Sequence, residues 1–96
     1  MKIVEILAPD GAVSVQWITQ DVGIVRYHAE GGFGSPTVFA VTMLCEGDAA
    51  EFHAGTGRGY TRQTHRAFRD AMHRIGITRV RYERRGATVR PKELTR

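Results

Sequence analysis

The feature that most restricts the fold of this chain is one strongly periodic helical segment, residues 61–75, with strand-like segments on both sides. At 100° per residue, one stripe of this segment collects side chains that can pack on a sheet. That stripe contains Thr61, Thr64, His65, Phe68, Ala71, Met72 and Ile75. Gly76 follows directly and suits the end of a helix. A helix with a single packing stripe needs a second layer, which the surrounding strands can supply.

Runs of β-branched and aromatic residues predict the strands of that layer. The predicted strands cover residues 2–7, 23–28, 37–44, 50–54, 78–84 and 87–90. Residues 12–18 fit either a strand or a short helix capped by Asp10, so both alternatives stay open here. Residues 30–36 and 55–59 are rich in glycine and predict loops. We therefore predict an α+β fold, with a mixed or antiparallel sheet and one principal amphipathic helix packed on it.

The length of 96 residues predicts a single domain, with residues 91–96 as a tail. No apolar run approaches the roughly 20 residues of a membrane span, and the first apolar stretch is too short for a signal-peptide core. Cys45 is the single cysteine, so no internal disulfide is expected. We expect a cytoplasmic protein without a membrane partner. A core of this size also favours a homodimer.

The charge is divided unevenly along the chain. Residues 1–57 carry two basic and seven acidic side chains, whereas residues 58–96 carry twelve basic and three acidic ones. The first part is therefore at −5 and the second at +9, for a total of +4. A basic half of this kind predicts an anionic partner, although arginines can also simply solvate a surface.

The order of strand, glycine-rich loop and helix over residues 50–75 predicts where an anion would bind. Glycines let the backbone approach a ligand closely, and the first amides of a helix have no intrahelical acceptor. The helix dipole and nearby arginines add positive charge there. The predicted ligand-binding residues are Gly55, Gly57, Arg58, Gly59, Thr61 and Arg62. A tight connection without a ligand is the alternative explanation of the glycines.

The segment from Ala50 to Arg85 resembles the central part of the GNAT acyltransferase superfamily. In that family a strand leads through Gln/Arg-x-x-Gly-x-Gly/Ala into a helix and then into a strand splayed away from the first. The resemblance implies acetyl-CoA or coenzyme A as ligand, with the pyrophosphate on the loop amides and the pantetheine arm between the strands. Gly57 and Gly59 occupy the motif glycines, and Ala54 stands where Gln or Arg is expected. The segment is also similar in style to small bacteriophage proteins.

This chain departs from the family at both ends of that segment. It is shorter, shows no two helices before the segment, and has no helix with a tyrosine acid after it. The resemblance therefore implies a reduced domain, whose identity as an N-acyltransferase enzyme stays open. The candidate catalytic residues are Glu51, at a position suited to a general base, and Tyr60, next to the loop.

Two alternatives follow from the basic half itself. A nucleic-acid-binding module would use Arg62, Arg66 and Arg69 on one helix face, together with Arg79 and Arg81 on the following strand. A protein-interaction module, of the kind a virus directs against a host factor, would use the same arginines on an acidic surface. The four histidines and Cys45 have no zinc-ligand spacing, so no metal site is predicted.

Overall fold

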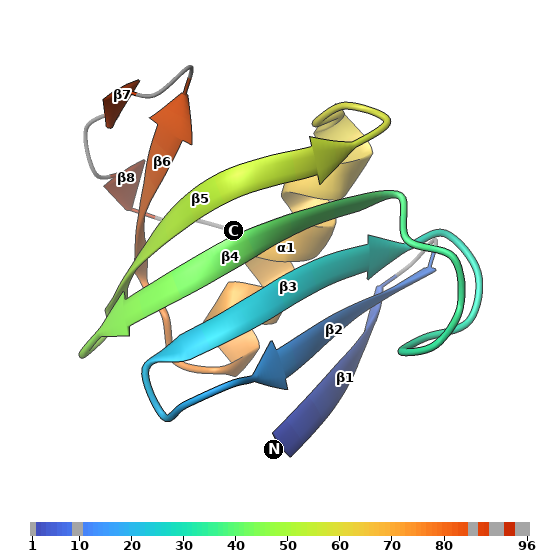
Figure 1. Cartoon of the computed structure of the whole chain (residues 1–96), viewed down its shortest axis with the longest axis horizontal. Helices are drawn as coiled ribbons and strands as arrows, with labels where there is room; N and C mark the ends of the chain where they lie inside the picture. The colour runs from blue at the N-terminus through green and yellow to red at the C-terminus, as the bar shows by residue number, and fades with distance from the viewer. Residues whose placement is uncertain (1, 9–10, 85–86, 89–91, 94–96) are drawn as a thin grey trace.

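The computed structural model describes residues 2–8, 11–84, 87–88 and 92–93, and these form an α+β fold. Each of the first four strands is antiparallel to the next one, and β6 lies parallel to β5 after the crossover through α1 (Figure 1). The short strands β7 and β8 both pair with β6. In chain order the elements are β1 (Lys2–Ala8), β2 (Gly11–Trp17), β3 (Val22–His28), β4 (Phe39–Glu46), β5 (Ala49–Gly57), α1 (Arg62–Arg74), β6 (Arg79–Arg84), β7 (Ala87–Thr88) and β8 (Lys92–Glu93). No helix in the described part of the chain is long and apolar enough to cross a membrane.

The helix forms where the periodic pattern predicted it. Thr61 is the N-cap, and its hydroxyl accepts a hydrogen bond from the Thr64 amide at 3.2 Å. Ile75 is the C-cap, and Gly76 follows with a φ of 89°, a conformation that glycine adopts without strain. The packing stripe differs in detail from the prediction, because Thr61 is exposed whereas Ala67 is buried. A cap residue lies outside the first helical turn and therefore need not follow the helical period.

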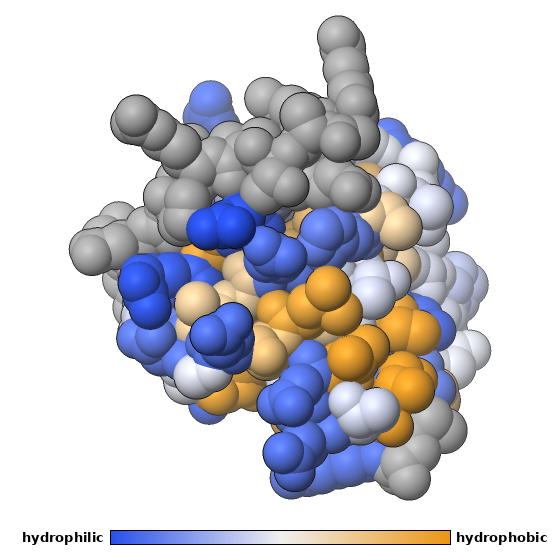
Figure 2. All heavy atoms as spheres, turned by 60° about the vertical axis from the view of Figure 1, so that its left-hand side comes forward, coloured by the Kyte–Doolittle hydropathy of each residue, from blue (hydrophilic) through white to orange (hydrophobic). Residues whose placement is uncertain are grey.

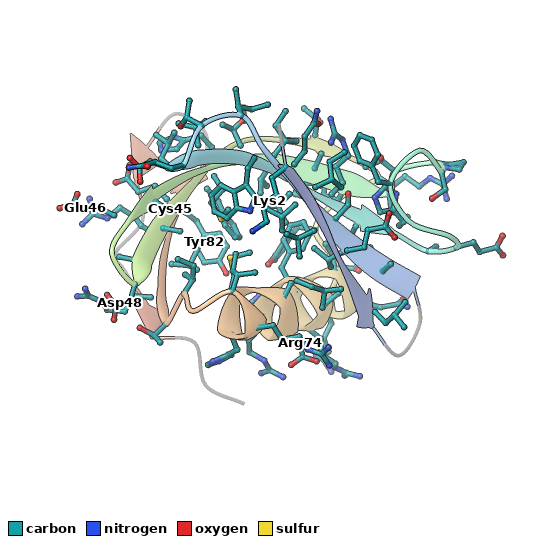
Figure 3. The ribbon with its side chains drawn as sticks, turned by 90° about the horizontal axis from the view of Figure 1, so that it is seen from below. Lys2, Cys45, Glu46, Asp48, Arg74 and Tyr82 are labelled. Atoms are coloured by element: carbon teal, nitrogen blue, oxygen red, sulfur yellow. The ribbon has the colours of Figure 1, made fainter. Side chains whose placement is uncertain are left out.

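The core lies between α1 and one face of the sheet, here called the helix-covered face. Alternate residues of each strand point to this face, as the pleat requires. Figure 3 shows the side chains filling the space between the two layers, with those of Cys45 and Tyr82 on the helix side. The largest buried apolar side chains include Phe68, Met43 and Met72. The other residues of the buried cluster are Ile6, Val13, Val15, Val25, Tyr27, Val41, Ala50, Phe52, Ala67, Ala71, Ile77 and Val80.

Most predicted strands are present with shifted ends. Residues 12–18 are a strand and not a helix, since β2 pairs on both sides over nearly its full length. The strand predicted at 37–44 begins at Phe39 and ends at Glu46. Within the segment predicted as a tail, Lys92–Glu93 forms a short strand that pairs with β6. Residues 89–91 and 94–96, which the prediction divided between a last strand and the tail, lie outside the described residues.

The prediction of a loop at residues 55–59 is also wrong for its first half. Strand β5 continues to Gly57, and the connection to α1 is correspondingly short. Strand β5 belongs both to a hairpin and to a βαβ unit, because it is antiparallel to β4 and parallel to β6.

The opposite side of the sheet, here called the open face, is not covered by a helix in the part of the chain that the structure describes. At one end it is covered by the chain that connects β3 to β4. Beneath this connection, the Ser14 hydroxyl and the His28 Nε2 atom lie 2.8 Å apart, and both residues are fully buried. The His28 Nδ1 atom lies 3.2 Å from the Pro36 carbonyl oxygen. Since a carbonyl only accepts, a neutral His28 ring donates from Nδ1 and accepts the Ser14 hydroxyl at Nε2.

Candidate ligand site at the end of strand β5

Strands β5 and β6 run side by side for only part of their length. Their ladder joins Ala49–Phe52 to Arg79–Tyr82, and the rest of β5 has no partner on β6. A bulge begins near this point, where Ala54 and Gly55 together face the single β4 residue Val41. Ala54 has a φ of 54°, and bulges of this kind bend a strand. Figure 1 shows the two strands diverging beyond their shared segment.

Aromatic side chains pack beside the opening between the two strands. The Tyr60 ring centroid lies 5.4 Å from that of Phe39, 5.9 Å from Phe68 and 6.2 Å from Tyr82. Tyr60 is nevertheless 39% exposed, and its hydroxyl lies 3.1 Å from His65 Nδ1. Burial raises the pKa of both tyrosine hydroxyls, so both keep their protons at neutral pH. The sequence pointed to Tyr60 but gave no indication of its His65 partner.

The glycines of this segment have different roles. A Cβ atom at Gly55 would lie 2.8 Å from the Phe39 ring, and one at Gly57 would collide with the Val38 carbonyl oxygen. Both positions therefore need glycine for packing against the chain beside them. Gly59 has open space around it and a φ of 108°. Glycine is favoured there because other residues rarely adopt this backbone conformation. Of the three predicted glycines, Gly59 is the one whose side is open to a ligand.

The connection and the first helical turn provide backbone donors and positive charge. The Arg58 amide already donates to the Val38 carbonyl at 3.0 Å, and Thr61 caps one amide of the first turn. The amides of Arg62 and Gln63 lie in the first turn, where backbone N–H groups have no intrahelical acceptor. The first turn contains no acidic residue, and the side chains of Arg58 and Arg62 are exposed. This end of α1 is therefore positive and accessible to an anion.

The two candidate catalytic residues do not come together. The Glu51 carboxylate lies on the open face, where it is 3.1 Å from both His53 Nε2 and Arg81 Nη1. Tyr60 packs against Phe68 on the helix-covered face. The sheet separates the two groups, so they form no acid–base pair around one ligand. Strand alternation could have predicted this, since Glu51 is adjacent in sequence to a core residue.

The arginines predicted to bind nucleic acid form two groups on opposite sides of the sheet. On α1, Arg62 and Arg66 are exposed and Arg69 is half-buried, on the side of the helix away from the core. Figure 3 shows that Arg74 also points away from the sheet. Arg79 and Arg81 instead lie on the open face, each in a 3.1 Å ion pair with a carboxylate. A single flat ligand surface cannot include both groups.

Figure 2 shows one end of the molecule, where apolar side chains are framed by hydrophilic ones. Described residues also line two hollows. Sequence reasoning found neither, because each is built from several strands. The first, of about 490 Å³, is lined by Leu44, Cys45, Glu46, Ala49, Ala50, Glu51, Arg79 and Arg81. The second, of about 580 Å³, is lined by Lys2, Val4, Trp17, Ile18, Thr19, Gln20 and Ile75. Neither hollow is lined by the predicted loop residues.

Comparison with known proteins gives no match to a family model, to a curated protein or to a solved structure. Within the described residues, no three His, Cys, Asp or Glu side chains form a group that could hold a metal ion. The chemical interpretation of the site therefore depends on its own geometry and charge.

Proposed function

We propose that this domain binds a phosphate-bearing ligand of the coenzyme A class at the end of β5. The observation that carries the proposal is the separation of two parallel strands next to a positive helix terminus. Beyond Phe52, β5 has no β6 partner, and the chain then passes through Gly59 into α1. The backbone groups of the unpaired part of β5 are suited to hydrogen bonds with the amides of a pantetheine arm.

The phosphates of such a ligand fit the positive end of the site. Arg58 and Arg62 are exposed, and neither forms an ion pair within the described part of the chain. Together with the amides of the first turn, they supply charge-assisted hydrogen bonds to phosphate oxygens. The exposed edge of the Tyr60 ring gives the arm an apolar surface. Binding is proposed without acyl transfer, because Glu51 lies on the other face of the sheet.

A second candidate function, binding of a nucleic acid backbone, is favoured by a different observation. The outer side of α1 carries Arg62, Arg66, Arg69 and Arg74, against the single acidic residue Asp70. Of these, Arg62, Arg66 and Arg69 lie about one helical turn apart and repel one another, and a row of phosphates would relieve this repulsion. The arginines of β6 are excluded from this surface, because they lie on the open face.

Calorimetric titration of the full chain with coenzyme A and with a short DNA duplex, at about 50 mM and about 300 mM salt, tests both candidates. We expect coenzyme A to bind at both salt concentrations. Replacing Arg58 and Arg62 together by Glu should weaken that binding by at least about tenfold, since two charge-assisted contacts are lost. Arg74→Glu, an exposed change at the other end of the same helix, is the matched control. Gly57 is unsuitable for this test, because any side chain there would collide with β4.

The outcomes separate the candidates. Failure of coenzyme A to bind, or equal binding by the Arg58/Arg62 variant, would reject the proposed site. Binding of DNA that disappears at the higher salt and weakens on Arg66→Glu would support the nucleic acid candidate instead. For that ligand Arg79→Gln is the control, because Arg79 lies on the opposite face. Retention of DNA by Arg66→Glu with an unchanged salt dependence would reject the second candidate.

A further inference from the structure

The two edges of the sheet differ in how they are covered. Strand β6 has β5 on one side, and β7 and β8 pair with its other side. Strand β1 pairs with β2 over all seven of its residues, without a bulge. On its outer side, β1 has no strand partner within the described residues. An uncovered, regular edge presents a row of backbone donors and acceptors to another strand.

The side chains of β1 do not protect this edge. Leu7 is 77% exposed and Ile3 is 40% exposed, and both lie on the open face. The strand contains no proline. Its one acidic residue, Glu5, has its carboxylate 3.3 Å from the Phe33 amide, so its charge is directed to the connection between β3 and β4. Lys2, at the first position of the strand, is its one lysine. From Ile3 to Leu7 the edge therefore lacks the lysine, proline and bulge by which proteins usually prevent edge pairing.

The order of residues along β1 makes it complementary to itself. On either side of Glu5 the residues are apolar: Ile3 and Val4 precede it, and Ile6 and Leu7 follow it. In an antiparallel pair, residues directly opposite each other lie on the same face of the sheet. A two-fold axis at Glu5 therefore places Ile3 opposite Leu7 of the second copy on the open face. On the helix-covered face it places Val4 opposite Ile6. It also places the two Glu5 residues opposite each other, and this like-charge repulsion opposes the pairing. The repulsion is reduced because each carboxylate lies at its own Phe33 amide.

We propose that β1 pairs antiparallel with β1 of a second copy of this chain, around a two-fold axis at Glu5. The pairing joins the two sheets into one and covers the two exposed apolar side chains of each β1 strand. An interface of this kind is isologous, so it closes as a dimer and does not continue into a filament. The inference is independent of the proposed ligand, whose site lies on the far side of β5 from β1 (Figure 1).

Sedimentation equilibrium of the full chain, from about 1 µM to about 1 mM, tests the dimer. We expect a reversible monomer–dimer equilibrium within this range. Leu7→Lys places a charge opposite Ile3 of the partner and should raise the dissociation constant by at least about tenfold. Leu44→Lys is the matched control, because Leu44 is 40% exposed on the open face of β4 and away from the edge. Circular dichroism confirms that both variants are folded.

The register has its own test by disulfide cross-linking in a Cys45→Ala background. Ile3→Cys and Leu7→Cys proteins are oxidised separately and as a mixture. Directly opposite cysteines can form a disulfide, so the mixture should cross-link faster than either protein alone. A chain that stays monomeric over the whole range, or a dimer that Leu7→Lys leaves unchanged, would overturn the proposal. Equal cross-linking of Ile3→Cys alone would overturn the axis at Glu5.

Discussion

The two faces of the sheet are built from the same strands, but their side chains make different kinds of interactions. The helix-covered face is continuous and apolar, with Phe68 and Met72 of α1 packed onto residues such as Val15 and Phe52. The open face carries ion pairs, half-buried apolar residues and the Ser14–His28 pair at one end. The comparison indicates that the helix-covered face contributes most of the stability of the fold, and that the open face contributes less.

The largest expected effect is on the helix-covered face. Phe68 is 1% exposed, and its ring contacts those of Phe39, Phe52 and Tyr60. Phe68→Ala removes these contacts and leaves a cavity, which should lower the free energy of unfolding by about 3–5 kcal/mol. Urea denaturation at neutral pH measures this change. Leu44→Ala on the open face is the control and should cost less than about 1 kcal/mol. Similar losses for the two variants would contradict the division between the faces.

The fold could be predicted from the sequence where local signals agree with tertiary packing. The helix is such a case, because Thr61 caps it, Gly76 follows it and its apolar stripe matches the sheet. The extent of β5 could not be predicted in the same way. Gly55 and Gly57 have the composition of a loop, yet they belong to a strand because Phe39 and Val38 approach them closely. That approach is a property of the neighbouring strand and is not encoded locally.

The local structure of the candidate site was predictable in part. The order of strand, glycines and helix predicted a connection that leads into the helix, and the structure has one between Gly57 and Arg62. The contact of Tyr60 with Tyr82 depends on how β6 returns beside β5, so no local pattern indicates it. The hollows on the sheet are likewise formed by side chains far apart in the sequence.

A smaller effect is expected from the buried polar pair on the open face. Ser14→Ala leaves the Nε2 atom of a fully buried His28 without the hydroxyl that lies 2.8 Å away. Leaving a buried acceptor without its donor should lower the free energy of unfolding by about 1–3 kcal/mol. This decrease is smaller than the one expected for Phe68→Ala. Urea denaturation gives the value, and a Ser14→Thr variant, which keeps a hydroxyl, is the comparison. If Ser14→Ala were as stable as the wild type, the pair would not contribute to holding the connection above it.

The smallest effect, and one that depends on pH, is expected at the turn between β4 and β5. The Asp48 carboxylate accepts hydrogen bonds from the Thr78 hydroxyl at 2.8 Å and from Arg79 Nη2 at 3.1 Å. The Thr78 bond, and then the bond and charge of Arg79, lower the pKa of Asp48 below its ordinary value of 3.8. Because the folded pKa is the lower one, the resulting stability is fully present above the unfolded pKa. It is lost as the pH falls through the folded pKa.

Asp48→Asn should therefore be slightly less stable than the wild type at neutral pH, and the difference should close as the pH falls below the folded pKa. Asp48 is exposed, so solvent screens its interactions and the loss is smaller than that of Ser14→Ala. An NMR titration of the Asp48 carboxyl carbon measures the pKa directly. Thr78→Val removes the strongest of the bonds and should move that pKa upward, toward 3.8. An Asp48 pKa at or above 3.8 in the wild type would show that the turn is not held to β6 by this carboxylate. The charges of the open face would then contribute nothing at this turn, which would sharpen the contrast with the helix-covered face.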